Sequence, residues 1–303
     1  MFAPAHLANW SGPRIDAECA VTHRAYRARR TGSYQTYFAA NLELKDEHHA
    51  YKAKDLATAL PDGWGKLAEA LPVSERHKEH LSGNSSQVLA LGLLGVAAQR
   101  DPSLVWLWEG LGPLPPPAAP HPRYQFERKL DPKTLKEQPR QTSIDFFVDD
   151  PAALLCIEAK WTEAGMGACG CGTKAAAKGD CSEKVLSRTA YWTTARDVLH
   201  LPERAVGTPC PLSFTYQAVR NVAAALKLAK PGQKPVFGLI YDAENPYFAG
   251  CGAWPGWPAA LNATLNDVGA PVMFASVSWQ ELVPLLPLDK AAAAWASEKH
   301  GLD

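Results

Sequence analysis

Residues 143–161 read SIDFFVDDPAALLCIEAKW, and this stretch decides the fold. It contains two apolar runs, over residues 143–148 and 154–161, with Asp-Asp-Pro between them. Short apolar runs on either side of an Asp-Pro turn are typical of two antiparallel strands joined as a β-hairpin. We therefore predict a hairpin with its turn at residues 149–151.

Three charged residues, Asp145, Glu158 and Lys160, interrupt these apolar strands. Side chains alternate between the two faces of a strand, so Glu158 and Lys160 share one face and Ala159 points to the other. The hairpin brings Asp145 back beside Glu158. Two adjacent carboxylates repel each other, which is tolerable if a divalent cation lies between them. The other interpretation is a buried salt bridge between Asp145 and Lys160.

The elements predicted around this hairpin give the order helix, three strands, helix, strand, strand. A mixed α/β sheet flanked by helices is the architecture that this order predicts. Asn84 or Ser85 is the expected N-cap of the first helix. The expected elements are a buried helix over residues 82–100, a Pro-rich loop over 111–122, a strand over 124–130, helices over 187–199 and 212–229, buried strands over 236–241 and 272–276, and a short helix over 279–286.

An acidic residue on one strand followed by Glu-x-Lys on the next resembles the active site of the PD-(D/E)XK nuclease superfamily. The resemblance covers roughly residues 80–290. In detail, the sequence is similar to a largely uncharacterised bacterial group within that superfamily. The resemblance implies a restriction-endonuclease-like fold, with a mostly helical or irregular N-terminal extension over residues 1–80. The nuclease-like domain would cover residues 81–303, with a Cys-rich insertion at 165–210. The motifs that carry the resemblance are NSSQ at 84–87, FE at 126–127, TSIDF at 142–146, IEAKWTEAGMG at 157–167 and YQAVRN at 216–221.

The resemblance also implies a role for each residue of the predicted site. Asp145 and Glu158 would ligate Mg²⁺ or Mn²⁺, with the carbonyl of Ala159 as a further ligand. Lys160 would position or activate the attacking water. Glu127 would add a carboxylate that contacts the metal or the water.

Four more residues have weaker assignments. Gln217 would face the site, Arg220 would meet phosphate, and Glu163 would reach the rim. Simpler interpretations stay open: Glu127 as an exposed strand residue, and Gln217 with Arg220 as ordinary helix surface. For Gln87 we expect only a contribution to the capping of its helix.

Seven cysteines are an odd number, which does not favour a disulfide scaffold. Four of them, Cys169, Cys171, Cys181 and Cys210, offer soft ligands that suit a tetrahedral structural Zn²⁺. An iron–sulfur cluster that recruits the upstream Cys19, or plain thiols, are the alternatives. The longest apolar run, residues 88–98, is far short of the roughly 20 residues that span a bilayer. We expect no signal peptide, no membrane association, a cytoplasmic protein and reduced thiols.

The formal net charge is zero, which excludes a globally basic binder of polyanions. Basic residues nevertheless gather locally: residues 123–140 hold six Lys or Arg against three acids, and residues 205–235 hold four and no acid. By itself this charge is also compatible with an ordinary solvated surface. The resemblance implies DNA as the partner and a metal-dependent deoxyribonuclease that hydrolyses phosphodiester bonds as the enzyme. The alternatives are an inactive nuclease-fold module that binds nucleic acid or a protein, and a zinc-stabilised interaction domain. A protein partner or a second copy of the chain is compatible with each.

Overall fold

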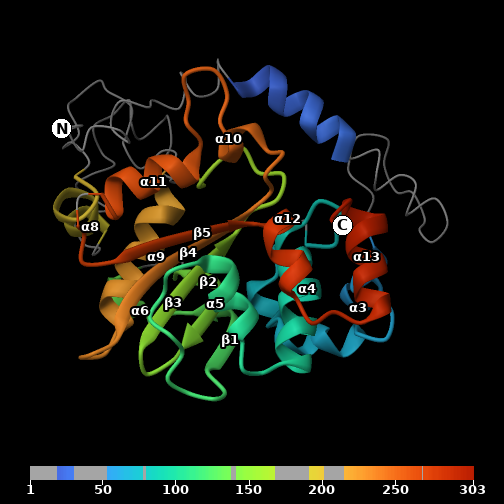
Figure 1. Cartoon of the computed structure of the whole chain (residues 1–303), viewed down its shortest axis with the longest axis horizontal. Coiled ribbons are helices and arrows are strands. Elements are labelled where there is room, and N and C mark those ends of the chain that lie inside the picture. The colour runs from blue at the N-terminus through green and yellow to red at the C-terminus, as the bar shows by residue number, and fades with distance from the viewer. Residues whose placement is uncertain are drawn as a thin grey trace.

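The structure is a computed structural model, and a five-stranded sheet with the order β1-β2-β3-β4-β5 forms its centre (Figure 1). β2 pairs antiparallel with β1 and with β3, whereas β3, β4 and β5 run parallel. The predicted mixed sheet is thereby confirmed. The strands are β1 Arg123–Lys129, β2 Ser143–Asp149, β3 Ala153–Ala159, β4 Lys234–Tyr241 and β5 Met273–Ser278. The structure describes residues 19–30, 53–77, 80–137, 141–167, 191–200, 215–267 and 269–303.

The β2–β3 hairpin has its turn where the sequence predicts it. Asp150 and Ala153 exchange two backbone hydrogen bonds across the turn. The buried Asp150 carboxylate accepts a further hydrogen bond from the amide of Ala152 at 2.8 Å, and two from the amides of Ala118 and Ala119 in the Pro-rich loop. The loop before β1 is therefore fastened to the hairpin turn.

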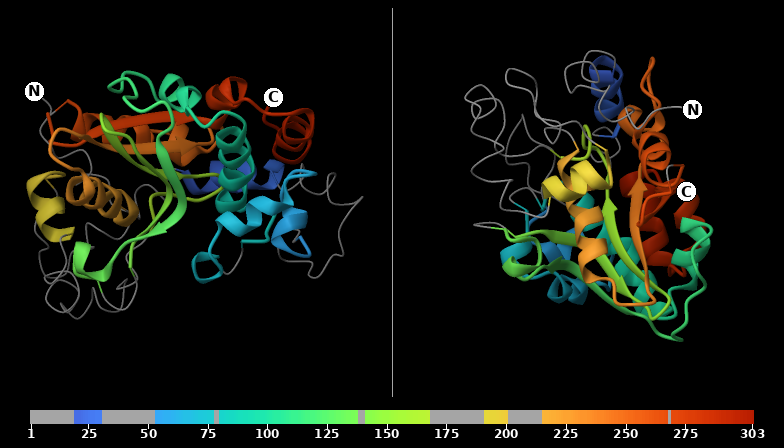
Figure 2. Two further views of the ribbon diagram at one scale, coloured as in Figure 1. Left: turned by 90° about the horizontal axis from the view of Figure 1, so that it is seen from below. Right: turned by 90° about the vertical axis from the view of Figure 1, so that its left-hand side faces the viewer.

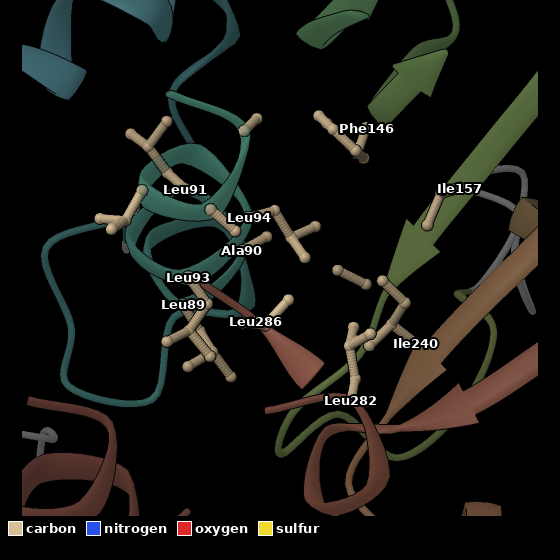
Figure 3. Close-up of a cluster of buried hydrophobic side chains, with 14 of the residues drawn as sticks. Leu89, Ala90, Leu91, Leu93, Leu94, Phe146, Ile157, Ile240, Leu282 and Leu286 are labelled. Atoms are coloured by element: carbon tan, nitrogen blue, oxygen red, sulfur yellow. The ribbon is translucent and has the colours of Figure 1, made fainter. Parts of the chain in front are cut away.

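Helix α4, Ser86–Arg100, covers one face of the sheet. Ser85 is its N-cap and accepts a hydrogen bond from the amide of Val88, as expected. Nearly every side chain after the first turn is buried, and Figure 3 shows its leucines packed against Phe146, Ile157 and Ile240 of the sheet. The other elements that contribute to this core are α3 Leu56–Ala59, η1 Gly65–Ala70, α5 Val105–Leu111, α12 Trp279–Leu282, η5 Val283–Leu285 and α13 Lys290–His300.

Helix α9, Tyr216–Leu228, covers the opposite face and makes the crossover between the parallel strands β3 and β4. In the left view of Figure 2, α9 and α4 lie on opposite sides of the strands. A second core forms here, around Phe147, Cys156 and Phe237. The smaller helices around it are α6 Pro132–Leu135, α8 Tyr191–Asp197, α10 Pro246–Ala249 and α11 Trp257–Leu265, and η2 Val73–Glu75 precedes α4.

The described parts of the first 80 residues pack against the rest of the molecule. Leu56 and Leu67 belong to the core around α4. A helix over residues 19–30, blue in Figure 1, is joined to the segment after α10 by a disulfide between Cys19 and Cys251, whose Cα atoms are 5.8 Å apart. The expectation of reduced thiols is therefore wrong for these two residues, because the fold brings positions 232 residues apart into contact. The domain boundary near residue 80 stays a prediction.

The disulfide also bears on the cysteine hypotheses. Because Cys19 is bonded to Cys251, it does not have the thiolate that the iron–sulfur alternative assigned to it. Cys169, Cys171, Cys181 and Cys210 lie outside the described residues, so the structural Zn²⁺ stays a prediction. None of the helices in the ranges given above has both the length and the apolar character needed to cross a bilayer.

The contact between α4 and α13 gives a test of the packing. A Cβ atom at Gly92 would lie 2.6 Å from Cη2 of Trp295. Replacing a helical glycine by alanine ordinarily stabilises by about 1 kcal/mol, but overpacking a filled core costs about 1–3 kcal/mol. We expect Gly92→Ala to lower the free energy of unfolding, measured by urea denaturation. Adding Trp295→Leu should cost less in this background than in the wild type; additive costs would contradict the contact.

Candidate active site

Three carboxylates lie in one row across β1, β2 and β3. The β1–β2 register pairs Phe126 with Phe146 and Arg128 with Ile144, so Glu127 lies opposite Asp145. The β2–β3 ladder ends with Phe146 paired to Ile157, and the next positions along the two strands are Asp145 and Glu158. The sheet therefore brings together all three acidic residues of the predicted site.

The strands β2 and β3 cease to pair at this row. Oδ2 of Asp145 accepts a hydrogen bond from the backbone amide of Ala159 at 2.8 Å, in place of a backbone carbonyl of β2. Asp145 keeps part of its surface exposed, whereas Glu127 and Glu158 are only 3% and 2% exposed. Asp145 is therefore the least buried carboxylate of the row.

Glu127 is buried, so its interpretation as an exposed strand residue is wrong. Its backbone has a φ of +46°, a left-handed conformation that costs a non-glycine residue roughly 1–2 kcal/mol. Its carboxylate accepts hydrogen bonds from Nε2 of Gln87 at 2.6 Å and from the hydroxyl of Ser143 at 2.7 Å. The cap of α4 is Ser85, so the expectation that Gln87 only extends the capping is also wrong. Gln87, in the first turn of α4, instead binds the carboxylate of Glu127.

Lys160 is paired with Glu158, not with Asp145 as the salt-bridge interpretation required. Its Nζ lies 2.7 Å from Oε1 of Glu158 and donates a second hydrogen bond to Oε1 of Gln217 at 2.9 Å. Gln217 therefore faces the site, and its interpretation as ordinary helix surface is wrong. Nδ2 of Asn221 donates to the other oxygen of Glu158, at 2.7 Å.

Where α9 packs on β3, the spacing of two side chains on the helix matches the spacing of two side chains on the strand. Glu158 and Lys160 are two residues apart on a strand, a rise of about 6.6 Å. Gln217 and Asn221 are four residues apart on a helix, a rise of about 6 Å. Each amide therefore meets one of the two charged groups. Both oxygens of Glu158 and two of the three Nζ hydrogens of Lys160 are held in this way.

Glu163 reaches the site from the segment that follows β3. Its carboxylate accepts hydrogen bonds from the amide of Trp161 and the hydroxyl of Ser86, the first residue of α4. Arg220 lies elsewhere: its guanidinium donates to the hydroxyl of Thr142 at 3.1 Å and lies over the ring of Tyr216. No contact of Arg220 with the carboxylate row is seen among the described residues.

Burial and charge together shift the titration of the site. Burial, followed by the charges of Glu158 and Glu127, raises the pKa of Asp145 well above its usual value. Burial also raises the pKa of Glu127. Burial lowers the pKa of Lys160, but the charges of Glu158, Glu163 and Asp145 outweigh it and raise that pKa overall. The lysine is therefore a cation, next to carboxylates that repel one another.

Oxygen donors of a kind that Mg²⁺ prefers are thus available at Asp145, Glu158 and the carbonyl of Ala159. Within the described ranges, no group of three or more His, Cys, Asp or Glu side chains is arranged to hold a metal ion. The side chains that sequence reasoning did not assign to the site are Ser86, Gln87 and Asn221. Asn221 follows Gln217 by one helical turn within YQAVRN, and that spacing is the signal that could have identified it.

The family described as Restriction Endonuclease associating with ARP (REase-ARP) matches residues 33–298, most of the chain. The chain belongs to this family. The REase-ARP assignment and the sheet together make the fold restriction-endonuclease-like, as expected, and the family description points to a nuclease-like function. No curated protein and no solved structure matches the chain.

Carboxylate repulsion predicts how stability depends on pH in the absence of metal. Because the pKa of Asp145 is raised in the folded state, its protonated carboxyl stabilises the fold. This contribution is fully present below the usual pKa of 3.8 and is lost as pH rises through the pKa of the folded state. We therefore expect Asp145→Asn to raise the melting temperature at neutral pH, measured in EDTA, and to flatten its decline with pH.

Asp149 is the matched control with the opposite sign. Burial raises its pKa, but hydrogen bonds from Gln233, Lys230 and Arg123 lower it overall. Its stabilisation is present above the usual 3.8 and is lost as pH falls. Asp149→Asn should therefore lower the melting temperature at neutral pH. Equal shifts in the two variants would contradict the proposed repulsion.

The contact between Gln87 and Glu127 gives another prediction. Gln87→Leu removes a donor from a buried carboxylate, which costs about 1–3 kcal/mol of unfolding free energy. The double variant Gln87→Leu/Glu127→Met removes both partners and should be more stable than Gln87→Leu alone. Urea denaturation measures both, and a double variant less stable than the single one would exclude this pairing.

Proposed function

We propose that this REase-ARP protein is a divalent-metal-dependent nuclease of the PD-(D/E)XK type that hydrolyses DNA phosphodiester bonds. The observation that carries the proposal is the placement of Lys160, a buried cation held by Glu158 and Gln217 at the end of an acidic row whose least buried carboxylate is Asp145. A structural ion pair needs no additional carboxylates around it. Here the charges of Asp145 and Glu163 raise the pKa of Lys160, and the charge of Glu127 raises the pKa of Asp145.

The residues present fit a hard divalent cation. Each oxygen of Glu158 accepts one hydrogen bond and retains a second lone pair, and Asp145 uses Oδ2 for the amide of Ala159, which leaves Oδ1 for a cation. Mg²⁺ commonly uses one or two protein carboxylates and completes its shell with water and substrate phosphate. Asp145, Glu158 and the Ala159 carbonyl would hold it. When bound, it would supply a Lewis acid for the phosphoryl oxygen.

The protein's own groups then have separate tasks. Lys160 has one N–H group beyond those given to Glu158 and Gln217, and this group would orient the attacking water or offset charge on a phosphoryl oxygen. Gln217 and Asn221 fix the lysine and Glu158 so that this geometry exists before substrate binds. Glu127, held by Gln87, would orient water next to Asp145.

The two basic segments named from the sequence offer less positive charge than their composition indicates. Arg123 and Lys230 both pair with Asp149, Lys129 pairs with Glu75, and Arg220 lies close enough to Glu137 to offset part of the rise that burial causes in the pKa of that carboxyl. Lys133, Lys136 and Lys227 are exposed around α6 and α9. A nucleic-acid path over this face stays part of the proposal, and so does a protein partner, which the family's description names as ARP.

The test is incubation with labelled DNA and RNA in Mg²⁺ or Mn²⁺. Asp145→Asn, Glu158→Gln and Lys160→Met should each reduce cleavage by at least about a hundredfold, as expected for general-acid–base and charge-stabilising groups. The first two should also weaken Mn²⁺ binding measured by calorimetry. Glu69→Gln, on the exposed surface of η1, is the matched control and should change neither quantity.

Two outcomes would reject the proposal. Cleavage that survives both carboxylate changes would place the reaction at another site. A wild type that binds nucleic acid but cleaves none under any of these conditions would favour the inactive nuclease-fold module.

A further inference from the structure

Residues 161–167, which directly follow Lys160, have an irregular backbone, and Ala164 is the one residue among them that is exposed. We call these residues the post-β3 segment. A buried carbonyl outside a helix or strand needs a hydrogen-bond donor from elsewhere in the molecule. Donors from three other parts of the chain meet this need, so the segment that leads away from Lys160 is fixed along much of its length.

Asn245, the N-cap of α10, holds two of these carbonyls. Its Nδ2 donates to the carbonyls of Trp161 and Glu163, both at 2.9 Å, and its Oδ1 accepts from the amide of Tyr247 at 3.1 Å. The side chain is fully buried, and both the nitrogen and the oxygen of its amide group have partners. The post-β3 segment is thereby fastened to the start of α10.

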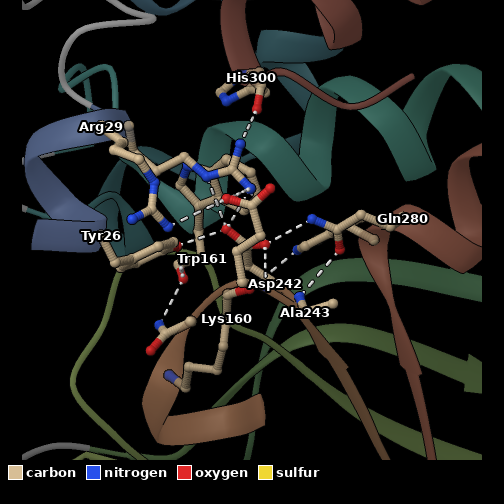
Figure 4. Close-up of polar contacts among 12 residues, drawn as sticks. Tyr26, Arg29, Lys160, Trp161, Asp242, Ala243, Gln280 and His300 are labelled. Atoms are coloured by element: carbon tan, nitrogen blue, oxygen red, sulfur yellow. Dashed lines mark hydrogen bonds and ion pairs between the residues drawn. The ribbon is translucent and has the colours of Figure 1, made fainter. Parts of the chain in front are cut away.

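The helix over residues 19–30 holds the same segment through its inner side. The buried stripe of this helix consists of Cys19, His23, Tyr26 and Arg30. The hydroxyl of Tyr26 donates to the carbonyl of Trp161 at 3.0 Å (Figure 4), and Nε2 of His23 lies 3.1 Å from the carbonyl of Thr162. Two successive carbonyls of the post-β3 segment therefore depend on this helix.

A buried ion pair fixes the last turn of that helix. Arg30 donates two hydrogen bonds, each 3.0 Å long, to the two oxygens of Asp242, the residue after β4, and a third to the carbonyl of His300. Tyr26 donates to the same carboxylate at 2.6 Å, as Figure 4 shows. The helix and the post-β3 segment are therefore both tied to the end of β4.

The last two residues of the post-β3 segment contact the first turn of α9. The amide of Gln217 donates to the carbonyl of Met166 at 2.9 Å. Gly167 lies against the side chain of Gln217, since a Cβ atom at this glycine would be 2.7 Å from Cδ and 2.8 Å from Cγ of Gln217. Cβ atoms essentially never come closer than 3.0 Å to such atoms. Gly167 also has a φ of +71°, which glycine adopts without steric cost.

The side chain that Gly167 touches is the one that holds Lys160. Oε1 of Gln217 accepts a hydrogen bond from Nζ of Lys160 at 2.9 Å. The carboxamide thus lies between the glycine and the lysine. A methyl group at position 167 would displace this flexible carboxamide, and the displaced oxygen would leave Nζ. The anchors described above prevent the post-β3 segment from yielding instead.

We propose that Gly167 is a positioning residue for Lys160. By leaving room for the carboxamide of Gln217, it fixes the direction in which Nζ presents its remaining N–H group. The proposal rests on the function proposed above for the part that Lys160 takes in cleavage, whereas the contact among the three residues is independent of that function. Gly167 acts only through Gln217, so its effect must vanish when the carboxamide is removed.

The first measurement is NMR of protein labelled with ¹⁵N at the lysine Nζ atoms, in EDTA. The control is Gly232→Ala, because Gly232 has a φ of +89° and no heavy atom of the described residues lies within 4 Å of the Cβ position. The Nζ resonance of Lys160, assigned by its loss in Lys160→Met, should shift in Gly167→Ala and in Gln217→Ala. It should stay at the wild-type position in Gly232→Ala, which has a comparable backbone strain without the contact.

The second measurement is the cleavage rate of the same variants in Mn²⁺. Gly167→Ala should lower kcat by about tenfold to about a hundredfold, the scale expected when a reacting group is displaced by about 1 Å. KM for DNA should stay unchanged, because the substitution alters no charge that could pair with phosphate. Gly167→Ala/Gln217→Ala should be no slower than Gln217→Ala alone, and Gly232→Ala should cleave like the wild type.

A Lys160 resonance that is unchanged in Gly167→Ala, or equally shifted in Gly232→Ala, would overturn the proposal. In an active enzyme, equal kcat values for these two variants would overturn it, and so would multiplied losses in the double variant. If Gly167→Ala does not fold, the double variant decides: a folded protein supports the contact with Gln217, and an unfolded one rejects it.

The proposed nuclease activity fails in a different way. A wild type that cleaves neither DNA nor RNA, together with a Lys160 resonance that shifts in Gly167→Ala and not in Gly232→Ala, would support the positioning of Lys160 and reject the nuclease. The two proposals are therefore distinguishable by experiment.

Discussion

Glu158 and Lys160 are buried side by side at the end of β3, and the surrounding elements are constrained by the need to supply this pair with hydrogen-bond partners. Removing either partner from such a pair leaves an uncompensated buried charge, which costs several kcal/mol. α9 supplies one amide side chain to each member of the pair: Gln217 accepts from Lys160, and Asn221 donates to Glu158. The backbone of Lys160 is fixed as well, since its amide bonds Ile240 and its carbonyl accepts from Trp279. The crossover helix and the parallel half of the sheet are thus tied to one ion pair.

α4 has to satisfy two opposite requirements within one helix. Between Val88 and Ala98 it is apolar on every side, because the sheet, η1 and α13 enclose it. Its first turn is polar and meets two carboxylates: Ser86 bonds Glu163, and Gln87 bonds Glu127. The start of this helix carries a partial positive charge from its aligned peptide dipoles, which favours negative groups there. A single element therefore supports both the hydrophobic core and the acidic row.

Local patterns predicted much of this architecture, because the hairpin, the buried helix and the strands each show in a short window of sequence. Asp145 and Glu158 were identified for the same reason: the turn between them fixes their register. The partners of these carboxylates were harder to identify, since Gln87 is 40 residues from Glu127 and Asn221 is 63 residues from Glu158. The helix over residues 19–30 shows no periodic pattern of apolar residues in the sequence. Two of its four buried residues, His23 and Arg30, are polar or charged. A polar stripe is recognisable as an inner face only when its partners are known.

The link between Arg30 and Asp242 joins positions 212 residues apart, and this separation has a consequence for biosynthesis. A ribosome that adds roughly 5–20 residues per second needs on the order of 10–40 seconds to travel from one to the other. Throughout that interval the helix segment lacks the carboxylate that will hold Arg30, and Cys251, the disulfide partner of Cys19, is synthesised later still. The first described segment to be synthesised is therefore among the last to dock, and its buried stripe faces water until the second half of the protein has been translated.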